Sequence, residues 1–173
     1  MKKLLLSAIF LLVLSPSARA QEAEHQYRVE GYGFGVYESL ESGPGWGGGF
    51  GGEAFVYKGL GLGGDLAIAA PFQERILSLN VSYSARSANG NRFEPFATGG
   101  FTHFSVGNLG PPPANGGNFG GGANFWLTKH VALRVEVRDT IGGRSLSIEY
   151  EPAGNSYAAP NNVLNLRIGV TFR

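Results

Sequence analysis

Apolar and polar residues alternate along the C-terminal part of the chain. From Val131 to Arg138 the odd positions are Val or Leu, and the even positions are Ala, Arg or Glu. From Asn165 to Phe172 the even positions are Leu, Ile, Val or Phe, and the odd positions are Asn, Arg, Gly or Thr. Successive side chains of a strand point to opposite faces, so this period of two predicts strands with one apolar and one polar face.

Extended along the chain, the pattern predicts eight strands. Most are about ten residues long, the length that a tilted strand needs to cross a bilayer. The predicted strands are Tyr27–Tyr37, Gly47–Tyr57, Gly59–Ala69, Arg75–Ala85, Phe93–Val106, Phe119–Thr128, Val131–Thr140 and Val163–Arg173. The fifth alternates poorly, so its two faces stay unassigned.

The predicted connections alternate in length. Two are tight, at Lys58-Gly59 and Lys129-His130, and Ser87–Asn91 contains the turn signal Asn-Gly. The connections at the other end are Glu38–Trp46, Gly107–Asn118, Ile141–Asn162 and the shorter Ala70–Glu74. Short turns at one end and long loops at the other are typical of outer-membrane barrels, in which the long loops face outward.

The first 20 residues have the features of a secretory signal peptide. Lys2 and Lys3 precede an apolar run from Leu4 to Leu14, and Ala18-Arg19-Ala20 is a small-residue cleavage site. We therefore expect cleavage after Ala20 and one barrel domain over residues 21–173. The apolar run is too short for a membrane-spanning helix, and no other stretch is apolar enough, so any membrane crossing falls to strands that close into a barrel.

Composition excludes several classes of protein. Three of the 14 basic residues lie in the expected signal peptide, so the rest of the chain has 11 basic and 13 acidic residues. This slightly acidic balance does not suggest nucleic-acid binding. The chain contains no cysteine, and its 28 glycines have no collagen-like register. Glycines inside apparent strands permit sharp bending in a small barrel.

Placing the charged positions inward assigns the faces of the first four predicted strands and of the last two. The inward positions are then Arg28, Glu30, Glu53, Asp65, Ser78, Asn80, Ser82, Ser84, Arg134, Glu136, Arg138, Asn165 and Arg167. Four arginines balance four carboxylates in this set, so each buried charge has a partner. An eight-stranded barrel is only wide enough for side chains to fill it, which predicts a packed ion-pair interior and no pore.

One stretch carries a family resemblance. The segment Gly120–Asp139 has glycines, an aromatic strand end, a tight polar turn and then Leu-Arg-x-Glu-x-Arg-Asp. It resembles the penultimate hairpin of the small outer-membrane β-barrel family, eight-stranded like the membrane domain of outer membrane protein A and outer membrane protein X. The resemblance implies an all-β, antiparallel, up-and-down transmembrane β-barrel in the outer membrane of a Gram-negative cell. It also implies a terminal strand that the barrel assembly machinery recognises, although Phe172 is here followed by Arg173.

His103-Phe104-Ser105 is the one candidate for catalysis. Residues i and i+2 share a strand face, so His103 and Ser105 could act as base and nucleophile. The pair resembles the His-x-Ser of outer-membrane lipid A deacylases, which also need an acid about a dozen residues further on. Asn115–Asn118 occupies that place without a carboxylate. His25, His103 and His130 lack metal-ligand spacing, so we assign no catalytic, cofactor-binding or metal-binding residue.

The sequence thus predicts a non-enzymatic outer-membrane barrel, with a structural envelope role or a role in displaying surface loops, and no open pore. Two alternatives stay open: a lipid A deacylase-like enzyme, and a soluble periplasmic, lipocalin-like binder, because inverting every face gives the same alternation. We expect a monomer without a cofactor. The expected partners are outer-membrane lipid, the assembly machinery through the C-terminal strand, and a surface partner met by the long loops.

Overall fold

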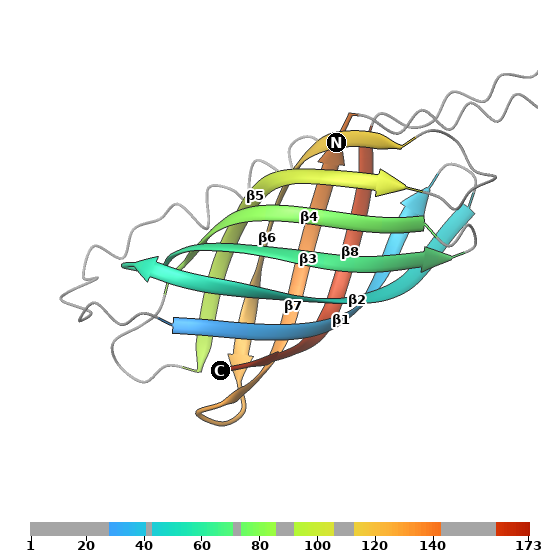
Figure 1. Cartoon of the computed structure of the whole chain (residues 1–173). Coiled ribbons are helices and arrows are strands. Elements are labelled where there is room, and N and C mark those ends of the chain that lie inside the picture. The colour runs from blue at the N-terminus through green and yellow to red at the C-terminus, as the bar shows by residue number, and fades with distance from the viewer. Residues whose placement is uncertain (1–27, 41–42, 71–73, 86–91, 106–112, 143–161) are drawn as a thin grey trace, which may run out of the picture.

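The structure is a computed structural model, which describes residues 28–40, 43–70, 74–85, 92–105, 113–142 and 162–173. Its strands are β1 (Arg28–Leu40), β2 (Gly43–Tyr57), β3 (Leu60–Ala70), β4 (Glu74–Ser84), β5 (Phe93–Ser105), β6 (Ala114–Trp126), β7 (Val131–Ile141) and β8 (Asn162–Phe172). They pair antiparallel in chain order, and β1 closes onto β8 (Figure 1). The predicted eight-stranded, up-and-down barrel is confirmed. The described residues include no helix long and apolar enough to cross a membrane.

Two predicted connections are partly strand. The prediction of a loop over Glu38–Trp46 is wrong, because β1 runs on to Leu40 and β2 begins at Gly43, with Glu38 opposite Gly45. Pro44 is the second residue of β2, and proline is tolerated at the start of a strand. Similarly, β6 begins at Ala114, inside the predicted loop over Gly107–Asn118.

The strands are staggered around the barrel. One row of paired residues can be followed from Val29 through Ala54, Leu62, Val81, Gly99, Phe119, Asp139 and Leu164 to Ser39. The row returns to β1 ten residues beyond its start. With about 3.3 Å per residue and about 4.8 Å between strands, this shift tilts the strands by about 40° from the barrel axis. Figure 1 shows the oblique course of the strands.

The assigned faces are confirmed. Every position predicted to point inward is buried except Arg28, which is partly exposed at the end of β1. The large apolar residues on the other face of β3, β4 and β8 are exposed, as are Leu133 and Val137 on β7, whereas Val135 is half-buried. The unassigned β5 turns Glu94, Phe96, Thr98, Thr102 and Phe104 inward.

Burial is the reverse of that in a soluble protein. Among the described residues, 21 polar or charged side chains are buried against 12 apolar ones, whereas 26 large apolar side chains are exposed. A polar interior behind a continuous apolar outer face suits a surrounding of lipid. A lipocalin-like binder would need the apolar face inside, so this alternative is wrong.

Candidate functional site

The centre of the barrel holds two ion clusters that share residues of β7. Arg134 Nη2 lies 3.0 Å from Glu53 Oε1 of β2 and 3.2 Å from Glu136 Oε2. The Arg134 guanidinium also lies 4.4 Å from the Tyr32 ring centroid and 4.0 Å from that of Phe96. Arg134, Glu136 and Arg138 are two residues apart on β7, so all three side chains point to the inner face. This one strand therefore contributes residues to both clusters.

Asp65 of β3 joins the second cluster. Its two carboxylate oxygens accept hydrogen bonds from Arg138 Nη1 at 2.9 Å and Arg167 Nη1 at 3.1 Å. Asn80 Nδ2 of β4 donates to Asp65 at 3.0 Å, and Arg138 Nε donates to Glu136 Oε1 at 2.7 Å. Charges and hydrogen bonds therefore bridge β2, β3, β4, β7 and β8 across the barrel, and each charged group of the two clusters has an oppositely charged partner.

Inward glycines make room for these large side chains. Gly169 lies between Phe34 on β1 and Arg134 on β7. A Cβ at Gly169 would come within 2.1 Å of the Gly33 carbonyl oxygen and 2.9 Å of Phe34 Cβ. A larger residue would therefore force the strands or the ring apart, because side chains do not approach so closely.

A third cluster closes the end with the short turns, which we call the turn end. Arg28 lies 2.9 Å from Glu30 and 2.7 Å from Glu94. Glu94 also accepts hydrogen bonds from Ser84 Oγ and, at 2.8 Å, from Trp126 Nε1. The Arg173 guanidinium stacks 3.6 Å from the Trp126 ring centroid. The last residue thus covers the cluster, while Phe172 before it faces outward.

The predicted balance of four arginines and four carboxylates is wrong. Glu38, Glu74 and Glu94 are also buried on the inner face. Sequence reasoning missed Glu38 and Glu74 because it placed them in loops, and Glu94 because the faces of β5 were unassigned. A continued period of two from Glu30 to Glu38 was the signal that could have found Glu38.

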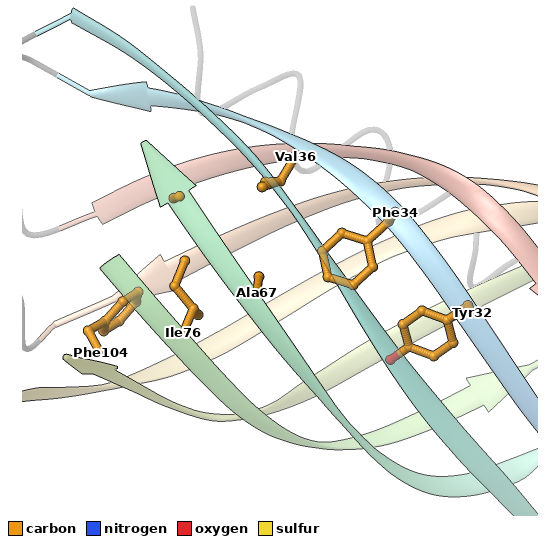
Figure 2. Packing of buried hydrophobic residues seen from close by; sticks show 7 residues of the cluster. Tyr32, Phe34, Val36, Ala67, Ile76 and Phe104 are labelled. Atoms are coloured by element: carbon orange, nitrogen blue, oxygen red, sulfur yellow. The ribbon is translucent and has the colours of Figure 1, made fainter. Parts of the chain in front are cut away.

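An apolar cluster begins beside the ion clusters, where Tyr32 and Phe34 pack against Arg134 and Arg167, and continues toward the loop end. Figure 2 shows Tyr32, Phe34 and Val36 of β1 facing residues of the opposite wall. The cluster comprises Tyr32, Phe34, Val36, Ala67, Ala69, Ile76 and Phe104. None of these was predicted as core, because the sequence argument placed only polar groups inside. The apolar cluster and the ion clusters together occupy the interior with side chains.

His103 and Ser105 lie on the outer face of β5 near its loop end. His103 Nδ1 and Asn115 Oδ1 of β6 are 2.8 Å apart, so an amide occupies the place where a deacylase would hold a carboxylate. Ser105 pairs in register with Arg75 of β4. His130 instead lies in the turn after β6, where its Nδ1 contacts the Arg173 carbonyl oxygen at 3.0 Å. His25 lies outside the described residues.

The part of the chain that the structure describes was searched for groups of side chains that could bind a metal ion. Within residues 28–173, apart from the gaps given above, no three His, Asp or Glu side chains group so as to hold a metal ion.

A closed barrel with an apolar outer face and paired charges inside defines a transmembrane β-barrel. The family model described as the outer membrane protein beta-barrel domain matches residues 6–172. The chain belongs to this family, and its place is the cell outer membrane. A search of curated proteins found no match.

Solved structures show the same fold at low identity. The N-terminal β-barrel domain of OprF from Pseudomonas aeruginosa is 14% identical, with a TM-score of 0.58 over 85% of this chain and 98% of that one. Neisserial surface protein A is 16% identical, with a TM-score of 0.55 over 84% and 96% of the two chains. OprG from Pseudomonas aeruginosa is 9% identical, with a TM-score of 0.56 over 83% and 93%. At these identities the likeness shows the fold alone.

Proposed function

We propose that this protein is a non-enzymatic outer-membrane barrel that serves the envelope structurally and displays its long loops, without an open pore. The observation that carries the proposal is the packed interior. The Arg138 side chain, 1% exposed, bridges Asp65 and Glu136 at the centre. Tyr32 and Phe34 pack against Arg134 and Arg167 of this centre, and Phe104 lies nearer the loop end of β5. Side chains that fill the cross-section of the barrel therefore support the proposal that it has no open pore.

Conductance measurements test the closed interior. Protein purified from outer membranes and inserted into planar bilayers is expected to give no stable channel, because ions would have to displace paired charges. An eight-stranded barrel lacks the aqueous lumen of the larger porins. Large and lasting single-channel steps from pure monomer, absent from protein-free bilayers, would contradict the proposal.

We propose no catalytic step at His103 and Ser105. A carboxylate stabilises the imidazolium that forms when a histidine accepts a proton, whereas the Asn115 amide carries no charge. The pair serves as polar groups near the rim of the lipid-facing band. Cells that overproduce the protein are accordingly expected to keep the acylation of their lipid A unchanged by mass spectrometry, and deacylation that depends on Ser105 would overturn this assignment.

We further propose that any surface partner is met by the long connections, between β5 and β6 and between β7 and β8, of which the second is the longer. Residues 143–161 lie outside the described residues, while Ile141 and Asn162 at its two ends pair with each other. Barrel strands hold the ends of such loops while the loops themselves vary.

Deletion of residues 143–160 is expected to leave the barrel folded, since no described strand is shortened. Heat-modifiable migration on gels measures this, with the full-length protein as the matched control. A deletion variant that no longer migrates as a folded barrel would show that the segment is structural, and the display role would lose its basis.

A further inference from the structure

The charged residues of the three short connections at the turn end are all basic. The turn between β2 and β3 contains Lys58, and the turn between β6 and β7 contains Lys129 and His130. Residues 85–92, between β4 and β5, include Arg86 and Arg92. None of these three connections contains an acidic residue. Because they alternate with the loops around a closed barrel, their charges are distributed around its circumference.

Three of these side chains lie just beyond the apolar outer band. We call Lys58, Arg92 and Lys129, all of them exposed, the basic rim. Lys58 follows the exposed Tyr57, with its Nζ 5.4 Å from the Tyr57 ring centroid, and Arg92 precedes the exposed Phe93. Lys129 follows the exposed Leu127 by two residues. Aromatic girdles mark the membrane interface, and long basic side chains beside them reach toward the headgroups.

The acidic residues that the structure describes near this end do not pair with the basic rim. Glu30 and Glu94 are buried inside the barrel and pair with Arg28. Among the described residues, no carboxylate forms an ion pair with any side chain of the basic rim. The outer face at the opposite end differs, because its described charged residues are one arginine, Arg75, and one aspartate, Asp139.

We propose that the basic rim binds the phosphates of anionic phospholipids in the leaflet at the turn end. In outer-membrane barrels the short turns face the periplasm, so this leaflet is the periplasmic one. Lysine and arginine near an anionic lipid surface each favour binding by about fivefold. The rim would thereby enrich anionic lipid around the barrel and hold the turn end at headgroup level.

Spin-labelled lipids measure this preference directly. The protein purified from outer membranes is reconstituted into phosphatidylcholine vesicles that contain traces of spin-labelled phosphatidylglycerol or spin-labelled phosphatidylcholine. We expect the association constant of phosphatidylglycerol to exceed that of phosphatidylcholine by at least about twofold when averaged over the whole lipid annulus. The preference should decline in concentrated salt, because exposed charges are screened.

The triple variant Lys58→Gln/Arg92→Gln/Lys129→Gln is expected to bring the two constants to near equality. The matched control is Arg75→Gln, which removes an exposed arginine at the opposite end and should keep most of the preference. Heat-modifiable migration confirms that each variant is folded.

Equal constants for the wild type, or an undiminished preference in the folded triple variant, would overturn the proposal. Peptidoglycan is the other anionic partner that the basic rim could bind, and sedimentation with purified peptidoglycan tests it. If the basic rim is needed for that sedimentation while the wild type shows no lipid preference, the partner is the cell wall and the lipid proposal is wrong.

Discussion

Replacing Arg138 with methionine is expected to lower the free energy of unfolding by about 3 kcal/mol. The Arg138 guanidinium contacts Asp65 Oδ2 at 2.9 Å and Glu136 Oε1 at 2.7 Å, and its side chain is only 1% exposed. Removing one partner of a buried ion pair leaves a charge without compensation, which typically costs about 3–5 kcal/mol. We expect a loss at the lower end of this range, because Asp65 still pairs with Arg167 and Glu136 still pairs with Arg134.

Denaturant unfolding of the barrel from lipid vesicles measures this loss. The control is Arg75→Met, an identical change at an exposed arginine on the outer face, for which we expect a change within about 0.5 kcal/mol. The double variant Arg138→Met/Asp65→Leu should lose less unfolding free energy than the sum of the losses of the two single variants, because both substitutions remove the same ion pair. An Arg138→Met barrel as stable as the wild type would show that the central cluster does not stabilise the fold.

The alternation revealed most of the barrel because charged and aliphatic residues contrast strongly on several strands. On β7 and β8 this contrast identified the strands and their inner faces. On β1 this contrast fades, because Tyr32, Phe34 and Val36 point inward while the outward positions 31, 33 and 35 are glycines. On β5 apolar residues occur on both faces. Where the inside of a barrel is itself apolar, polarity no longer distinguishes the two faces of a strand.

The partners of the buried charges could not be read from the sequence. Asp65 and Arg167 are 102 positions apart along the chain, and they meet because of the ten-residue stagger of the closed barrel. Alternation fixes which face a residue occupies and leaves its height within the barrel open. The same reason hid the role of Arg173, whose contact with Trp126 depends on β6 and β8 ending together at the turn end.

Replacing Val135 with arginine is expected to destabilise the barrel by about 2–4 kcal/mol, the cost of a basic residue on the lipid face near the middle of the bilayer. Val135 lies on the outer face of β7, paired in register with Ala123 on one side and Ile168 on the other. An arginine there either enters hydrocarbon or draws water and headgroups toward the middle of the membrane. The unfolding free energy in lipid vesicles measures the loss.

Val131→Arg is the matched control, because Val131 lies on the same face of the same strand, four residues nearer the turn end. At about 3.3 Å per residue on a tilted strand, this moves the charge by about 10 Å toward the headgroups. Near the interface the cost falls to about 0–1 kcal/mol. A clear difference between the two variants follows from a lipid-facing outer surface. Two equally small losses would mean that Val135 does not lie within the hydrocarbon, and the outer face of β7 would have to be reassigned.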